Sequence, residues 1–278
     1  MALMESWYPA ASAQPWDRVG LIVGDPFAPV RSILLALDPT AAITEQAVAG
    51  PDGDGVSYDM VITHHPLLLR GASLLPVTDP KGSVVTTLIR SGIALFNAHT
   101  NADVACDGVA TALADLIGLR DTAPLEPCGT DAEGHDIGLG RVGTVDETTL
   151  GAFADHVASV LPAGPSGLLV GGDESAQVTR VAVLGGAGDS ALEAARAAGV
   201  DVYLTADLRH HPASEHLEGG APELLCGSHW ATESPWLPVL ARKIRQAARS
   251  ADVELRVEVS TIVTEPWTSH RVTQGELA

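Results

Sequence analysis

Residues 58–66 read YDMVITHHP, an apolar run typical of a buried strand that ends in His-His-Pro. A second strand-like run follows at residues 93–103, IALFNAHTNAD, and leads into His-x-x-x-Asp. The same order returns later in the chain, where residues 200–212 read VDVYLTADLRHHP and residues 223–233 read ELLCGSHWATE. A pattern of this length that occurs twice, with helical segments between its strands, predicts an internal duplication.

The rest of the chain has the same alternating character. Short apolar runs bounded by Gly, Pro and Asp alternate with helical patterns, which is typical of an α/β fold. Residues 32–37 and 179–184 are predicted strands that open the two copies, and residues 137–144 are a predicted strand between them. The sequence therefore predicts two similar α/β domains, residues 1–127 and 128–278.

Composition excludes several classes of function. The chain has 278 residues, and its 35 acidic and 16 basic residues give a formal charge of −19. This charge disfavours binding to nucleic acid or to an anionic membrane surface, because both need clustered Lys and Arg. The N-terminus lacks the basic and apolar regions of a signal peptide, and no segment approaches the roughly 18 consecutive apolar residues of a membrane helix. We expect a cytoplasmic protein with no nucleic-acid or membrane partner.

Several reactive residue types have no pattern that assigns them a role. The cysteines form neither an even set nor a Cys-x-x-Cys pair, so they predict neither a disulfide framework nor a thiolate zinc site. These are Cys106, Cys128 and Cys226. Three histidines have no partner motif and are predicted to face solvent. They are His135, His156 and His270.

Imidazole and carboxylate groups at strand ends are the ligands that borderline divalent metals use. Pro66 helps to end its strand, so two consecutive histidines could turn toward one region. Each His-x-x-x-acid pair lies on one face if the segment is helical. We therefore predict one set of metal ligands, able to hold two ions of Zn, Fe, Mn, Ni or Co at a site between the domains. The set is His64, His65, Asp103, His229 and Glu233.

Such a site suits a hydrolase that acts on a small-molecule substrate, with bound water as the nucleophile. His99, His210 and His211 are the candidates for proton transfer, because imidazole titrates near neutral pH. Two alternatives remain open. One is a metal-binding scaffold or regulatory interaction protein without turnover, and the other is a structural metal that holds the two copies together. Duplication followed by loss of ligands in one copy would also explain a second His-His-Pro without chemistry.

The glycine-rich segment 185–188 has two interpretations. A strand precedes it and a helical pattern follows, which resembles a phosphate-binding turn. It lacks the full Gly-x-Gly-x-x-Gly spacing and the Walker lysine, so a tight turn that needs positive φ is the simpler interpretation.

Five ordered motifs resemble the NGG-interacting-factor-three-like proteins, often labelled GTP cyclohydrolase 1 type 2 homologues. The motifs read WDRVGLIVG at 16–24, ITHHP at 62–66, HTNAD at 99–103, LTADLRHH at 204–211 and HWATE at 229–233. Two positions depart from the usual family pattern. Arg18 stands where Asn is typical, and Ser228 stands where Gly is usual.

The resemblance implies a two-domain α/β protein with a dinuclear divalent-metal site, assembled as a homohexamer with its sites facing an internal cavity. Carried over by motif, it implies the same five ligands that the spacing predicts. It also points to GTP as a substrate, and a phosphoester fits the chemistry equally well. Neither departure removes a ligand, although Arg18 could alter which anion the mouth of the site accepts.

Overall fold

The structure is a computed structural model that describes residues 1–273, and the chain divides into two compact units. The first unit contains Met1–Ala112, Pro127–Leu139 and Ser234–Thr264. The second unit contains Leu113–Glu126, Gly140–Glu233 and the chain from Glu265. These units do not coincide with a division at residue 127, because a late helix and strand of the chain return to the sheet of the first unit.

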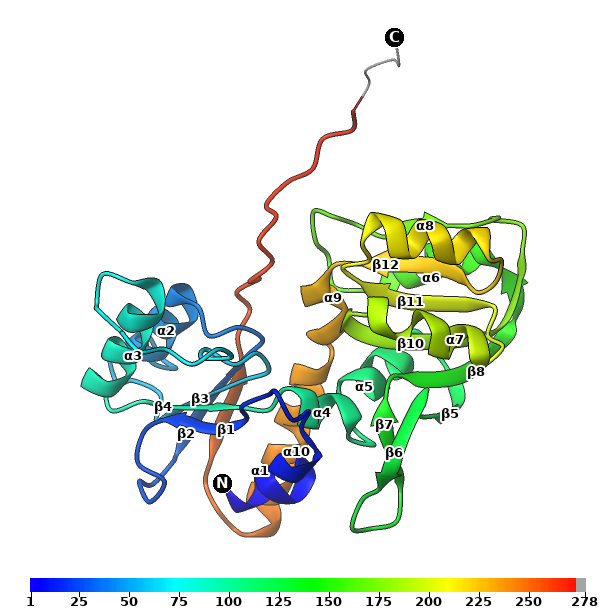
Figure 1. Cartoon of the computed structure of the whole chain (residues 1–278). Helices are drawn as coiled ribbons and strands as arrows, with labels where there is room; N and C mark the ends of the chain where they lie inside the picture. Colours follow the sequence, from blue (N-terminus) through cyan, green and yellow to red (C-terminus); the bar gives the residue numbers. More distant parts are fainter. Residues whose placement is uncertain (274–278) are drawn as a thin grey trace. The chain divides into compact units, whose positions relative to one another are not determined.

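The first unit is built on a five-stranded sheet in the order β1-β4-β3-β2-β13 (Figure 1). Strand β1 pairs antiparallel with β4, and the other neighbours are parallel. The bounds are β1 Gly20–Val23, β2 Ser32–Ala36, β3 Met60–Thr63, β4 Ala94–Asn97 and β13 Arg256–Val259. Every residue of β3 and β4 is buried, as expected for parallel strands that are covered on both faces.

Helices α2 (Ala41–Ala49), α3 (Pro80–Arg90) and α10 (Trp236–Ser250) belong to this unit. Capping residues define where two of them begin. The side chain of Thr40 accepts a hydrogen bond from the amide of Ile43, and Asp79 caps α3 just before a proline at its first position. The apolar sides of α2 and α3 pack into one core cluster with the strands.

The first unit also contains short helices and a hairpin. The helices are α1 (Ala2–Trp7), η1 (Ala10–Ser12) and α4 (Thr100–Val104). The hairpin pairs β6 (Glu126–Thr130) with β7 (Asp136–Leu139). Helix α5 (Val109–Leu116) carries the chain from the first unit into the second.

The second unit contains a six-stranded sheet in the order β5-β8-β10-β11-β12-β9. Strands β10, β11 and β12 are parallel, whereas β5, β8 and β9 pair antiparallel with their neighbours. The bounds are β5 Arg120–Ala123, β8 Arg141–Thr149, β9 Leu169–Gly171, β10 Gln177–Ala187, β11 Val202–Ala206 and β12 Glu223–Gly227. The helical segments are α6 Leu150–Val160, η2 Asp189–Ala191, α7 Leu192–Ala197, α8 His210–Glu218 and α9 His229–Glu233.

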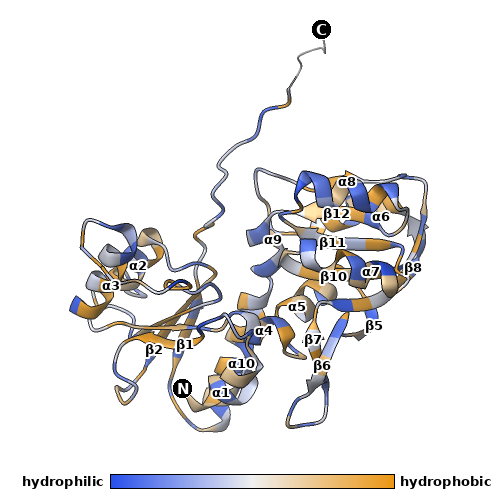
Figure 2. Ribbon diagram, in the orientation of Figure 1, coloured by the Kyte–Doolittle hydropathy of each residue, from blue (hydrophilic) through white to orange (hydrophobic). Residues whose placement is uncertain are grey.

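Alternate residues of β10 pack into two different cores. Val181 and Val183 join a cluster that includes Phe153 of α6, whereas Ala182 and Leu184 join a second cluster. This follows from the period of two along a strand, which sends neighbouring side chains to opposite faces. In Figure 2, helix α8 is coloured mainly as hydrophilic, whereas hydrophobic residues run through the strands of its unit. The sheet of this unit is therefore covered on both faces, and the α/β class predicted from the sequence is confirmed.

Two predicted elements differ from the structure. Residues 137–144 are not one strand, because Gly140 has φ +63° and separates β7 from β8. The second His-His-Pro does not follow its strand directly as the first does. His210 and His211 form the first turn of α8, and Pro212 is accommodated there because the first turn of a helix needs no amide donor.

Helix α8 is held by a buried histidine. His216 Nε2 lies 3.0 Å from the carbonyl oxygen of Pro222, and its Nδ1 lies 3.2 Å from a guanidinium nitrogen of Arg196. Since Arg can only donate, the ring accepts at Nδ1 and donates from Nε2, which requires the neutral form.

Burial lowers the pKa of His216. The unfolded chain then binds this proton more readily than the folded chain, so the free energy of unfolding is highest above pH about 6.5. It falls as the pH drops from there through the lower pKa of the folded state. Urea unfolding at several pH values across this window should show that the free energy of unfolding depends less steeply on pH in the His216→Gln variant. Equal slopes in the two proteins would contradict this assignment.

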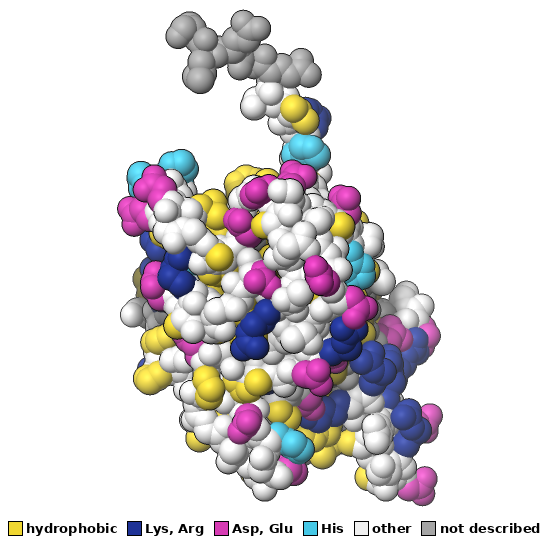
Figure 3. All heavy atoms as spheres, turned by 90° about the vertical axis from the view of Figure 1, so that its right-hand side faces the viewer, with side chains coloured by type: hydrophobic (Ala, Val, Ile, Leu, Met, Phe, Trp, Pro, Cys, Tyr) yellow, Lys and Arg dark blue, Asp and Glu magenta, His cyan; other side chains and the backbone are white. Residues whose placement is uncertain are grey.

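None of the helices among residues 1–273 is both long and apolar enough to cross a membrane. The cytoplasmic location stays a prediction from the sequence. On the face drawn in Figure 3, acidic and basic side chains are interspersed.

Candidate metal centre

The first unit gathers three histidines at the ends of two neighbouring strands. His64 and His65 directly follow β3, and His99 follows β4 and precedes α4. Their ring centroids are 5.0 to 5.7 Å apart, and one ligand nitrogen from each lies within 4.8 Å of the others. Strand β3 ends at Thr63 and the chain bends at His64 and His65, as expected from the sequence.

Each of these rings is held through Nδ1. His64 Nδ1 lies 2.9 Å from the carbonyl oxygen of Ala98, and His65 Nδ1 lies 2.6 Å from Oδ1 of Asp38. His99 Nδ1 lies 3.0 Å from Oδ2 of Asp17. A carbonyl or carboxylate on one ring nitrogen is the arrangement that metal-ligating histidines use. It makes Nε2 of each ring the nitrogen that could bind an ion.

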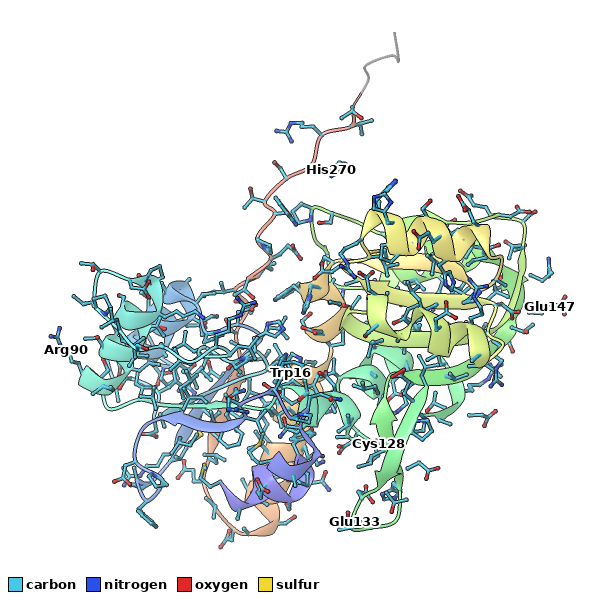
Figure 4. The ribbon with its side chains drawn as sticks, viewed as in Figure 1. Trp16, Arg90, Cys128, Glu133, Glu147 and His270 are labelled. Atoms are coloured by element: carbon cyan, nitrogen blue, oxygen red, sulfur yellow. The ribbon has the colours of Figure 1, made fainter. Side chains whose placement is uncertain are left out.

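Asp17 is the more buried of the two carboxylate anchors. Its Oδ2 accepts hydrogen bonds from the hydroxyl and the amide of Thr100, at 2.6 and 3.1 Å. Burial alone would raise the pKa of Asp17, but hydrogen bonds from Thr100 and His99 outweigh it and keep the pKa below its usual value. The carboxylate is therefore ionised at neutral pH and favours the tautomer of His99 with its proton on Nδ1. Trp16, labelled in Figure 4, packs edge-on against the same ring at 6.0 Å.

Asp103 supplies the carboxylate of the first unit. It lies on α4, four residues after His99, and its Oδ1 is 3.6 Å from Nε2 of His64. His64 is fully buried, whereas Asp103 is partly exposed. We refer to His64, His65, His99 and Asp103 as the first cluster.

The second unit builds a smaller cluster from His229 and Glu233, which begin and end α9. His229 Nε2 lies 3.0 Å from Oε1 of Glu233, so the predicted i, i+4 pair forms on one helical face. His229 Nδ1 lies 2.7 Å from Oδ2 of Asp207, which repeats the anchoring seen in the first cluster. We refer to His229 and Glu233 as the second cluster.

The backbone at Gly186 lies against the second cluster. Gly186 has φ +71°, and a Cβ added there would lie 2.2 Å from Oε1 of Glu233 and 3.0 Å from Nε2 of His229. Its amide donates to the hydroxyl of Thr232 at 3.0 Å. Residues 185–187 thus belong to β10, and within the segment 185–188 only Gly186 has the positive φ that the tight-turn interpretation requires. Its second glycine also leaves room for two predicted ligands.

His210 and His211 are exposed at the start of α8, and their rings meet edge to face at 5.1 Å. Their role in proton transfer stays a prediction. The histidine anchors Asp17, Asp38 and Asp207 were not assigned from the sequence. Each closely precedes or follows a strand in the chain, and Asp17 and Asp207 lie within quoted motifs, but their partners are distant in sequence. The structure also places a ring nitrogen of His99 among the atoms that could hold an ion.

Replacing Asp207 with Asn is expected to weaken metal binding at His229 by roughly 10- to 100-fold, the usual cost of losing an outer partner of a metal ligand. Asp207 has φ +52°, a conformation that Asn tolerates, so the fold should survive. Competition with a chromogenic chelator measures the affinity. The exposed Asp173→Asn serves as the control, and equal affinities in both variants would show that Asp207 does not orient a ligand.

Together, the fold and the two clusters define an α/β protein with several sheets and His/carboxylate groups that could hold a metal ion. The model of the Duf34/NIF3 (NGG1p interacting factor 3) family matches residues 1–266, and the chain belongs to this family.

Relatives cover nearly the whole chain. A GTP cyclohydrolase 1 type 2 homolog from Streptomyces coelicolor is 44% identical over 268 residues, which span 96% of this chain and 92% of the relative. One from Mycobacterium leprae is 32% identical, over 95% of this chain and 93% of the relative.

Solved structures share the fold. A hypothetical protein of Staphylococcus aureus has a TM-score of 0.86 at 27% identity and covers 97% of both chains. A Bacillus cereus protein related to NIF3 has a TM-score of 0.88 at 24% identity over 96% of both chains, which bears on the fold alone.

Proposed function

We propose that this protein is a metal-dependent hydrolase that binds two divalent ions through His64, His65, Asp103, His229 and Glu233. The observation that supports it most is the anchoring of histidines in both clusters. Four rings hold Nδ1 against a carboxylate or a carbonyl, which presents Nε2 to a ligand. Imidazole nitrogen with carboxylate oxygen suits Zn, Fe, Mn, Ni or Co.

Bound divalent ions would polarise the substrate and lower the pKa of a coordinated water to near 7. The residues of the chain supply orientation and proton transfer. Asp17, Asp38 and Asp207 fix the tautomer of the histidine that each one contacts. His99, His210 and His211 are the proposed groups for moving a proton at neutral pH.

The proposed substrate is a small molecule, either GTP or another phosphoester. The support is the name of the relatives, GTP cyclohydrolase 1 type 2 homolog, together with the suitability of two ions for attack by hydroxide on such substrates. A homohexameric assembly in the cytoplasm is also proposed, from the family resemblance.

A substrate screen tests the activity. The purified protein is loaded with each of the five candidate metals in turn, and release of product from GTP and from a model phosphoester is followed. We expect turnover with at least one metal and its loss after treatment with a chelator. Turnover that survives complete removal of metal would overturn the proposed mechanism.

A second candidate is a metal-binding scaffold without turnover. The description of the family as an interacting factor favours it. Turnover of the metal-loaded protein distinguishes the two candidates. A scaffold binds the ions but converts no substrate with any of them, whereas the hydrolase turns over only when it is loaded.

We also propose that the two units arose by duplication. In both units, a short strand precedes three consecutive parallel strands in sequence and pairs antiparallel with the third of them, as β1 does with β4 and β9 does with β12. His99 and His229 each lie two residues after the last parallel strand, and an acidic residue follows each four positions later. These correspondences support a common origin for the two clusters.

A further inference from the structure

A third group of metal-ligating side chains lies in the first unit, apart from the predicted ligands. Cys106 follows α4, whereas Asp131 and His135 lie in the turn that joins β6 and β7. One ligand atom from each lies within 4.8 Å of the other two. The sequence offered no pattern for them, because 25 residues separate the thiol from the nearer of its partners.

The distances within this group are close to those of a coordination shell. Cys106 Sγ lies 3.3 Å from Oδ2 of Asp131, and His135 Nδ1 lies 3.0 Å from the same oxygen. With Zn–S near 2.3 Å and Zn–N or Zn–O near 2.0–2.1 Å, tetrahedral geometry separates such ligands by about 3.3–3.6 Å. Small side-chain adjustments would therefore let the three atoms surround one ion.

The hairpin turn holds its two ligands in place. Oδ1 of Asp131 accepts hydrogen bonds from the amides of Glu133 and His135, at 3.0 and 2.8 Å. The amide of Asp131 donates to the carbonyl oxygen of His135 at 2.9 Å. Oδ1 is thus occupied by backbone, and Oδ2 is the oxygen that faces the thiol and the imidazole. Figure 4 labels Cys128 and Glu133 on this hairpin.

A pocket of about 770 Å³ adjoins the three side chains, and every residue that lines it belongs to the first unit. Trp7, Asn101 and Lys243 line it together with the three ligands. Lys243 pairs with Asp107, which lies next to Cys106 in the chain. Three protein ligands beside such a pocket leave a fourth position for water or a small molecule, as in zinc sites that are not purely structural.

A thiolate nucleophile explains these residues less well. Burial raises the pKa of the Cys106 thiol to about 11, and the hydrogen bond to Asp131 adds to this. The imidazole of His135 contacts the carboxylate of Asp131, which is also the hydrogen-bond acceptor of the thiol. The thiol is therefore not activated by its neighbours.

We propose that Cys106, Asp131 and His135 bind a thiophilic divalent cation of the Zn²⁺ type, at a site separate from the two clusters described above. The ion replaces the thiol proton, which is released to solvent, so that thiolate sulfur, carboxylate oxygen and imidazole nitrogen become its ligands. Sulfur in the donor set selects Zn²⁺ or Co²⁺ over Mg²⁺ and Ca²⁺.

Cobalt titration tests this proposal. A thiolate bound to Co²⁺ gives a charge-transfer absorption in the near ultraviolet, which His and carboxylate ligands do not give. None of the five ligands of the proposed hydrolytic site is a cysteine, so this band reports only on the new site. We expect it in the wild type and in Cys128→Ser, whose cysteine is exposed and lines the same pocket. We expect its loss in Cys106→Ser.

A second variant tests the site independently, in case Cys106→Ser does not fold. The side chain of His135 is 63% exposed, so His135→Ala should fold normally. It should weaken Co²⁺ binding at least 10-fold by titration of the same band. The absence of a thiolate band in the wild type would overturn the proposal. So would a band in Cys106→Ser and His135→Ala that has the same strength and Co²⁺ affinity as in the wild type. Neither result would alter metal binding by the two clusters, which is measured separately by metal content in Cys106→Ser.

Discussion

Replacing both His64 and Glu233 with alanine is expected to remove the metal bound at the two clusters and to reduce the proposed hydrolysis by orders of magnitude. Each change deletes one proposed ligand. The loss of a ligand should lower metal affinity by more than the roughly 10- to 100-fold typical of an outer partner. His64 is fully buried with its Nδ1 on the carbonyl of Ala98, and Glu233 contacts His229 at 3.0 Å. Elemental analysis and substrate turnover measure the two effects.

The matched control is His270→Ala with Glu147→Ala, a pair of the same residue types that are both exposed (Figure 4). It should retain metal and activity. Circular dichroism of both double variants verifies that the fold is intact. Full metal content in a folded His64→Ala/Glu233→Ala protein would remove these residues from the site. Normal metal content with lost turnover would assign them a catalytic role without ligation.

The second large effect is expected from Gly186→Ala. Its Cβ would lie 2.2 Å from Oε1 of Glu233, which is far inside van der Waals contact, so the carboxylate or the strand must move. The positive φ of +71° adds about 1–2 kcal/mol for any residue with a Cβ. We predict a loss of metal affinity of at least 10-fold and a lower free energy of unfolding, measured by chelator competition and urea unfolding.

Gly199→Ala separates strain from steric displacement. Gly199 belongs to the same unit and has φ +62°, but nothing lies within 4 Å of the position of its Cβ. This control should lose only the backbone contribution to stability and should retain its metal affinity. If both variants bind metal equally well, the close approach of Gly186 to the second cluster has no role in ligand placement.

Much of the fold follows from local sequence. Strands β3 and β11 are continuous apolar runs bounded by turn residues, and parallel strands with two buried faces require such runs. Helix α2 begins after Thr40 and ends at Gly50, as its capping residues indicate. The return of α10 and β13 to the first unit could not be read in this way, because strand order depends on contacts across some 200 residues.

The proposed ligands are easier to predict from the sequence than the residues that orient them. His64 and His65 lie directly after β3, and helical spacing alone brings His229 and Glu233 together. Asp17 and Asp38 lie 82 and 27 residues from the histidines that they contact, so no local sequence pattern predicts these contacts. His210 and His211 share a motif with His64 and His65, but three residues separate the end of β11 from His210, and both histidines enter a helix instead.

Metal content per chain is the most direct test of the central claim. Elemental analysis of tag-free protein, purified without chelator and in the Cys106→Ser form so that only the two clusters contribute, should find about two divalent ions per chain. The same analysis of that protein with His64→Ala and Glu233→Ala should find a clear loss. No bound metal in the first protein, and none taken up when each candidate ion is added back, would contradict the metal-dependent function and leave the repeated histidines as inherited architecture.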